Sequence, residues 1–215
     1  MRLRTLIRAA TLGLTVTTLS FAAAADVAGA QAFVEKEHGA IKKLVDANAA
    51  QSEVTKVIDA MVDYDEVARR ALGQPCPTTI PSCTNHWAEL NDDQKKEMTS
   101  LFRQLVEKKY RENAQKTKDY DISYRGAKEA GNDIAKVRTE AKDKNKPREP
   151  AVQVDYLIKG SGPYKVVDLV TEGSILSKNY YDQSHKMLTT QGQGYPYLVQ
   201  KLKDRIAGKK DKDSK

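Results

Sequence analysis

Alternation of apolar and polar residues predicts a β-hairpin in the last third of the chain. Every second residue from Val152 to Ile158 is apolar, which is the period of a strand with one buried face. The turn residues Gly160–Pro163 follow, since glycine tolerates positive φ and proline fixes its own φ. A second β-rich run, Tyr164–Thr171, completes an antiparallel pair.

Two helices are expected after this hairpin. Ser177 can act as the N-cap of the first, which carries Tyr180 and Tyr181. The second runs from Tyr195 to Ala207 with a buried apolar face, and Gly208 ends it.

The first half of the chain has the helical period instead. Residues 28–48 place apolar side chains on one face and lysines and glutamates on the other, and Ser52 can cap a second helix. In the third helix, Asp63–Gly73, carboxylates occupy the first turn and arginines the last, which suits the helix dipole. Residues 28–73 therefore predict three consecutive helices.

The clearest helical pattern comes next. Asn91 and Gln94 form a near capping box for the longest helix. Apolar residues from Met98 to Tyr110 then recur at spacings of three and four. Such a stripe is more often protein core than the wall of a ligand site.

Beyond Tyr110 the period changes to that of strands. Residues 120–124 and 133–141 each alternate, and a polar loop, 142–150, separates them from the hairpin. Helices, then about four antiparallel strands, then two helices define an α+β fold rather than alternating βαβ units.

Composition and charge narrow the function classes. The chain has 215 residues, enough for one sizeable domain with tails, and a formal net charge of +7. Much of this charge lies in Arg2, Arg4, Arg8 and the lysine-rich end, residues 208–215. No dense basic helix or aromatic–basic ladder remains, so we expect no nucleic-acid partner.

The N-terminal segment has the pattern of a secretory signal. Three arginines precede the apolar run Ala9–Ala25, which ends in small residues before Asp26. We therefore expect a signal peptide at 1–25, a domain at 26–207 and a disordered lysine-rich tail at 208–215. An uncleaved membrane anchor is the alternative, although the run is short and threonine-rich. A cleaved signal places the protein outside the cytoplasm, in a bacterium in the periplasm.

The two cysteines agree with an oxidising compartment. Cys76 and Cys83 flank a proline-rich segment, and closing this short loop with a disulfide is the simplest interpretation. With His86 they do not form a recognised zinc spacing. We expect neither a metal nor a cofactor.

No strong catalytic motif is present. The carboxylates Asp63, Asp65 and Glu66 are explained by a helix start. Asp155 and Asp168 lie between apolar residues in strand patterns, and either could become a general base in a closed apolar cavity. Alternation favours Asp155 facing water or an edge partner. An enzyme is therefore the weaker hypothesis.

Seven segments form an ordered series along the chain: Val62–Gly73, Trp87–Tyr110, Val154–Tyr156, Tyr164–Leu169, Glu172–Leu176, Asn179–Gln183 and Leu198–Leu202. Their order and spacing resemble the MlaC-like, toluene-tolerance family of periplasmic phospholipid carriers across residues 28 to 206. The chain departs from the family pattern at the Cys76–Cys83 loop, at Tyr164, at Tyr181 and in the loop 142–150.

The resemblance implies a soluble monomer shaped as a cone with an apolar cavity that holds a diacyl phospholipid, with no other cofactor. Its partners would be an outer-membrane lipoprotein complex and an inner-membrane ABC transporter with a membrane-anchored substrate-binding ring. The candidate ligand-binding residues are Val57, Met61, Tyr64, Val67, Leu72, Phe102, Leu105, Val106, Tyr110, Tyr156, Val167, Leu169, Ile175, Leu176 and Tyr180.

Three alternatives remain open at this stage. A related carrier could take a hopanoid or another isoprenoid lipid. A cavity enzyme on a similar cone-shaped fold would need a buried, hydrogen-bonded Asp or His at the base of its pocket. A structural adaptor would have an interior completely filled by side chains.

Overall fold

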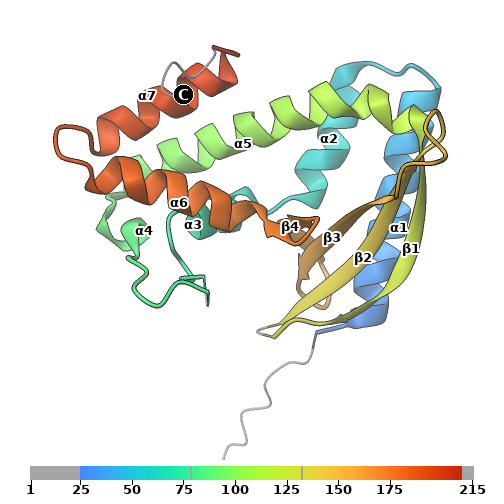
Figure 1. Ribbon diagram of the computed structural model, residues 1–215, viewed down its shortest axis with the longest axis horizontal. Coiled ribbons are helices and arrows are strands. Elements are labelled where there is room, and N and C mark those ends of the chain that lie inside the picture. Colours follow the sequence, from blue (N-terminus) through green and yellow to red (C-terminus); the bar gives the residue numbers. More distant parts are fainter. Residues whose placement is uncertain (1–24, 78, 132, 210–215) are drawn as a thin grey trace, which may run out of the picture.

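The computed structural model describes residues 25–77, 79–131 and 133–209, so all but the last residue of the expected signal peptide and most of the lysine-rich tail lie outside the described residues. Helices precede a sheet, and two helices follow it, as the α+β prediction requires (Figure 1). The elements are α1 (Val27–Asp46), α2 (Gln51–Met61), α3 (Tyr64–Ala71), α4 (His86–Glu89), α5 (Asp92–Ala114), the 3-10 helix η1 (Gln115–Asp119), β1 (Tyr120–Glu129), β2 (Ile134–Asp143), β3 (Val152–Lys159), β4 (Lys165–Thr171), β5 (Ser174–Ile175), α6 (Leu176–Thr189) and α7 (Tyr195–Ile206).

The sheet has five antiparallel strands in the order β1-β2-β3-β4-β5. Four of them are the predicted strands, and β5 is a two-residue addition. β1 is longer than the predicted 120–124 because a bulge between Tyr124 and Ala127 interrupts the alternation before the strand continues. Gly126 lies in this bulge with φ of 95°, a conformation that favours glycine.

The helix starts show which cap predictions hold. The capping box is confirmed: Asn91 Oδ1 accepts a hydrogen bond from Gln94 N at 2.9 Å, and Asn91 N donates to Gln94 Oε1 at 3.0 Å. Asp63 caps α3 by accepting from Glu66 N. The predictions for Ser52 and Ser177 are wrong.

Both serines lie inside their helices. Ala50 precedes α2 without a side-chain cap, and Ser52 is exposed in the first turn. α6 begins directly after β5, so Ser177 is its second residue, and its amide and hydroxyl both donate to Asp168 on β4. Ser177 therefore joins α6 to the sheet instead of capping the helix.

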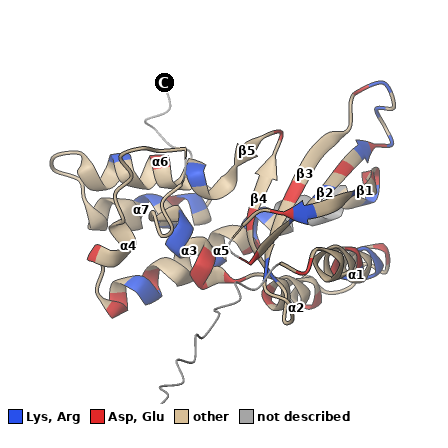
Figure 2. Cartoon of the chain, turned by 90° about the horizontal axis from the view of Figure 1, so that it is seen from below, with Lys and Arg blue, Asp and Glu red and all other residues tan. Residues whose placement is uncertain are grey.

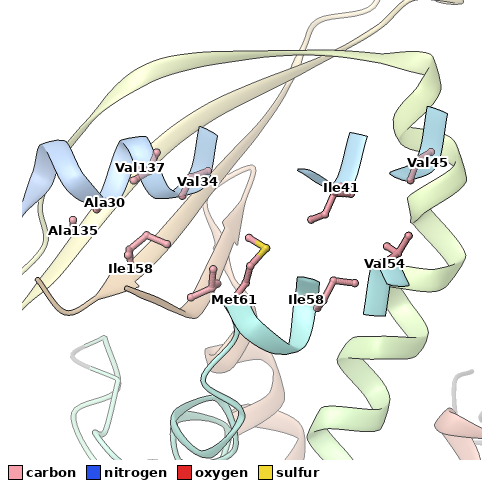
Figure 3. Close-up of a cluster of buried hydrophobic side chains, with 11 residues drawn as sticks. Ala30, Val34, Ile41, Val45, Val54, Ile58, Met61, Ala135, Val137 and Ile158 are labelled. Atoms are coloured by element: carbon pink, nitrogen blue, oxygen red, sulfur yellow. The ribbon is translucent and has the colours of Figure 1, made fainter. Parts of the chain in front are cut away.

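The buried apolar residues form two clusters instead of one. The first lies between α1, α2 and one face of the sheet, and Figure 3 shows α1 and α2 facing each other through Ile41, Val45, Val54 and Ile58. The second lies among α3, α4, α5 and α7 and includes Phe102. A compact domain usually has one contiguous core, so the division needs an explanation.

A predicted disulfide closes the loop between α3 and α4. Cys76 and Cys83 are bonded, which confirms the prediction. The Tyr181 hydroxyl on α6 accepts a hydrogen bond from Thr84 N at 2.8 Å. The cysteine loop and Tyr181 of α6 therefore contact each other through Thr84.

A buried carboxylate attaches α3 to the sheet. Glu66 is only 5% exposed and contacts three cations: Arg69 at 2.9 Å, Arg70 at 2.9 Å and Lys159 of β3 at 3.4 Å. Since an unpaired buried charge is costly, this cluster fixes the position of α3.

The capping box offers a test of the fold. Replacement Asn91→Ala leaves the amide of Gln94 without its acceptor, so the free energy of unfolding should fall by about 1 kcal/mol. Urea unfolding followed by circular dichroism would measure this. Lys96→Ala, a change at an 80% exposed side chain of the same helix, is the control. Equal stability of the two variants would contradict the capping role.

Candidate functional site

A cavity of about 400 Å³ lies where the two hydrophobic clusters fail to meet. α5 supplies part of its wall, including Phe102 and Leu105 of the second cluster. Leu169 of β4, which packs against the first cluster, lies on the wall too. The remaining wall residues are Val67, Val106, Lys109, Tyr110, Thr171, Ser174, Leu176, Asn179 and Tyr180. The cavity thus accounts for the divided core.

The polar side chains of this cavity lie at its exposed margin, and the apolar side chains lie inside it. Its polar side chains, Lys109, Thr171, Ser174 and Asn179, are all exposed. Its apolar and aromatic side chains are buried or half-buried. The cavity therefore has an apolar interior and a polar rim, which suits an amphiphilic ligand with one apolar end and one hydrated end.

A second cavity of about 370 Å³ lies between α1, η1, β1 and the end of α5. Tyr110 lines both cavities, so one side chain stands between them. The other wall residues are Glu35, His38, Gly39, Ile41, Lys42, Thr117, Tyr120, Asp121, Ile122, Tyr124 and Tyr156.

His38 is a titratable group on the wall of the second cavity, and burial favours its neutral form. Burial lowers the pKa of His38 from 6.5 to about 4. Its Nδ1 lies 3.1 Å from the Tyr124 hydroxyl, and its ring packs edge-on against Tyr156 with ring centroids 5.0 Å apart. Burial also raises the pKa of Tyr110, Tyr124 and Tyr156. These four side chains are therefore uncharged at neutral pH.

The structure brings most of the candidate ligand-binding residues to these walls. Those on the first cavity are Val67, Phe102, Leu105, Val106, Tyr110, Leu169, Leu176 and Tyr180, and Tyr156 lines the second. Their binding of a ligand stays a prediction. The candidates that line neither cavity are Val57, Met61, Tyr64, Leu72, Val167 and Ile175.

The residues away from the cavities have other contacts. Leu72 and Val167 are fully buried in packed protein, and Met61 belongs to the first cluster. The hydroxyl of Tyr64 donates to Asp59 at 2.8 Å. Periodicity identifies a buried face, but it does not separate side chains that touch other side chains from those that touch a cavity.

Sequence analysis missed the second cavity. A usable signal was present in His38, a polar residue on the apolar face of the first predicted helix, which the structure places on the cavity wall. The tyrosines of β1 gave no such signal, because their strand pattern did not show which helix packs against them.

The predicted orientation of Asp155 is wrong. This residue is 0% exposed, with Lys136 Nζ at 3.0 Å and Arg138 Nε at 3.4 Å from its carboxylate oxygens. Arg138 stands directly opposite Asp155 in the β2–β3 register. Cations of the neighbouring strand therefore cover the carboxylate, which sequence alternation alone could not reveal.

Asp168 is buried as well, and burial raises the pKa of its carboxyl group. It accepts hydrogen bonds from Leu169 N at 2.9 Å and Ser177 N at 3.0 Å. Neither Asp155 nor Asp168 is among the residues lining the two cavities. Both are better explained as contacts that hold the fold together.

The described residues contain neither a candidate metal site nor a candidate membrane span. Within residues 25–77, 79–131 and 133–209, no group of three or more His, Cys, Asp or Glu side chains could hold a metal ion. No helix in this part of the chain is both long enough and apolar enough to cross a bilayer.

Comparison with known proteins places the chain in a wider context. The model of the MlaC protein family matches residues 35–204. A crystal structure of the phospholipid-binding protein from Ralstonia solanacearum, in complex with a phospholipid, is similar with a TM-score of 0.66 and 20% sequence identity, over 83% of this chain and 97% of that one. No curated protein matches the chain.

The lowered pKa of His38 predicts a pH dependence of stability. Below pH 6.5 the unfolded chain takes up a proton that the folded state binds only near pH 4, so the free energy of unfolding falls as pH drops through this interval. Between pH 7 and pH 5, protonation of His38 in the unfolded chain should lower the free energy of unfolding by about 2 kcal/mol. Urea titrations at both pH values should show this loss for the parent protein and not for His38→Phe. The same loss in both proteins would exclude His38 as its source.

Proposed function

Because the chain belongs to the MlaC protein family, we propose that it is a lipid carrier that binds a phospholipid by its acyl chains. The observation that carries this proposal is the cavity between the two hydrophobic clusters, with an apolar interior and an exposed polar rim. Acyl chains would replace the missing contact between the clusters, and the headgroup would stay hydrated at the rim.

The structural neighbour supports a phospholipid as the ligand. That protein, from Ralstonia solanacearum, contains a bound phospholipid, and its whole length is nearly covered by the similarity. The two cavities described here have volumes of about 400 and 370 Å³ and share Tyr110. Two acyl chains could therefore enter separate cavities on either side of that side chain.

The energetics suit a carrier. Each CH₂ group removed from water contributes roughly 0.8 kcal/mol, so two long chains would favour the cavity over water by more than any measured net affinity. The same chains are already dry in a bilayer. Transfer between membrane and cavity is then nearly balanced, and a partner can decide its direction.

The rim offers polar contacts for a headgroup. Thr171, Ser174 and Asn179 lie next to one another around β5 and the start of α6, and Lys109 of α5 lies on the same cavity wall. Hydroxyl, amide and ammonium groups can all donate hydrogen bonds to phosphate oxygens. These donors support a binding mode in which the polar end of the lipid lies at the exposed margin.

The proposal also covers where the protein acts and which complexes exchange lipid with it. Residues 1–25 are proposed to be a cleaved signal, so that the domain at 26–207 acts in the periplasm as a monomer with a lysine-rich tail at 208–215. Lipid would pass between an outer-membrane lipoprotein complex and an inner-membrane ABC transporter with its membrane-anchored substrate-binding ring. Membership of the MlaC protein family supports this location and these partners.

One observation bears on the enzyme alternative. His38 is a half-buried, hydrogen-bonded histidine on the wall of the second cavity. With a pKa of about 4 it is a weak base at neutral pH, well below the range that favours general-base catalysis. Carrier function therefore explains the cavities better than enzyme function does. An isoprenoid lipid is the alternative cargo.

Native mass spectrometry of the mature protein, purified from a bacterial periplasm without detergent, tests the proposal. We expect a stoichiometric adduct whose organic extract contains diacyl phospholipid. An adduct of isoprenoid mass would change the cargo. An apo mass, in a protein that also takes no lipid from vesicles, would contradict carrier function.

A polar substitution in the cavity should abolish loading. Leu105→Asp would test this, but Leu105 is 3% exposed within the second cluster, so that variant also endangers folding. Leu169 is half-buried on the cavity wall and is the better site. Leu169→Asp should lower bound lipid per protein more than tenfold, since a carboxylate would have to be desolvated beside the acyl chains.

The control for Leu169→Asp is Val152→Asp. Val152 lies on β3, is 38% exposed, and lines neither cavity. The Val152→Asp variant should retain the lipid content of the parent protein, measured by extraction and phosphate assay. Full lipid content in folded Leu169→Asp protein would remove this residue from the binding site.

A further inference from the structure

Four basic side chains gather on one part of the sheet, outside both cavities. On β2, Ala135 and Val137 are buried against α1, so the alternating Lys136 and Arg138 point to the opposite face. In Figure 2, α1 and α2 lie on one side of the sheet, and no helix of the described residues lies over β1–β3 on the other.

β1 adds two more cations to this face. Lys128 stands directly opposite Lys136 in the β1–β2 register, and Arg125 lies in the bulge between Tyr124 and Ala127. Like charges directly opposite each other destabilise a strand pair. Folding alone therefore does not explain this arrangement, and a binding role for the cations would.

The same residues surround a small hollow. A pocket of about 150 Å³ is lined by Arg125, Gly126, Ala127, Lys128, Lys136 and Arg138. Its position coincides with the bulge, where Gly126 takes a positive φ and a Cβ atom in its place would meet nothing within 4 Å. The bulge thus leaves open space between the basic side chains.

A buried carboxylate orders two of these cations. Asp155 lies beneath them, with Lys136 at 3.0 Å and Arg138 at 3.4 Å, while its Oδ1 also accepts from Gln153 Nε2 at 3.1 Å. Because Asp155 is 0% exposed, it can hold the two cations in place but cannot itself meet a ligand. The Arg138 side chain remains 45% exposed.

The carboxylates do not neutralise the group. Besides Asp155, Glu140 pairs with Arg125 at 2.8 Å, and within the described part of the chain no carboxylate forms an ion pair with Lys128. Four cations against two carboxylates leave an excess of two positive charges around the pocket. An anion with two charges would balance them.

We propose that this basic pocket binds a phosphate group. A phosphate offers several acceptor oxygens within a small volume, which matches converging lysine and arginine donors. The phosphate could belong to an anionic headgroup at a membrane surface or be free in solution. The site lies on the opposite sheet face from Tyr124 and Tyr156 of the second cavity, so it goes beyond the proposed acyl-chain binding.

Titration of the mature protein with inorganic phosphate, followed by backbone amide NMR, tests the site. We expect saturable shifts at residues 125–128 and 136–138. Arg138→Gln and Lys128→Gln should each weaken binding by about fivefold. Lys128→Gln disturbs no ion pair among the described residues, so it keeps the test independent of folding. Lys96→Gln, at an 80% exposed side chain on α5, is the charge-matched control.

A second arm distinguishes the sources of the phosphate. Sedimentation of the same variants with vesicles of phosphatidylglycerol, and with vesicles of phosphatidylcholine, measures membrane association. If the variants weaken the binding of inorganic phosphate but leave vesicle association unchanged, the ligand of the pocket is a soluble phosphate. A loss confined to phosphatidylglycerol vesicles in Arg138→Gln and Lys128→Gln assigns a headgroup. The proposal is overturned if Arg138→Gln and Lys128→Gln change neither phosphate affinity nor vesicle association by more than Lys96→Gln does.

Discussion

The separation of two hydrophobic clusters by one rigid helix is the constraint on which the rest of the structure depends. Phe102 and Leu105 of α5 belong to the second cluster, whereas Tyr110, farther along the same helix, packs against the first. At 1.5 Å rise per residue, Phe102 and Tyr110 are about 12 Å apart along the axis. A helix cannot shorten to close this distance, so the clusters remain apart and the space between them remains open.

Polar contacts hold the other walls of that space in position. Glu66 binds α3 to Lys159 of β3, and Asp168 of β4 binds the start of α6 through Ser177. α3 and α6 both contribute side chains to the cavity between the clusters. Buried ions and hydrogen bonds, whose partners are specific, thus do what apolar filling does elsewhere in a domain: they fix the distance between elements without occupying the volume between them.

The order of helices and strands could be predicted from sequence because it depends on local periodicity and caps, as the capping box at Asn91 and Gln94 confirms. The environment of single side chains depended on distant partners instead. Local sequence predicts Ser177 to be a helix cap, but its contact is with Asp168 of β4. Local alternation predicts a surface position for Asp155, but two cations of β2 cover it. Among the candidate wall residues, Leu105 and Leu72 have the same apolar character, and only the arrangement of α5, β4 and α6 around the cavity separates them.

The open space has a consequence for the volume of the protein. Wherever water does not fill them, the two cavities of about 400 and 370 Å³ add void volume to the folded state that the hydrated unfolded chain does not have. Hydrostatic pressure favours the state of smaller volume, so an empty molecule would be easier to compress and to unfold than a domain of equal size with one filled core. A ligand that fills the cavities would remove this excess volume. Resistance to pressure would then depend on the bound ligand and not on the chain alone.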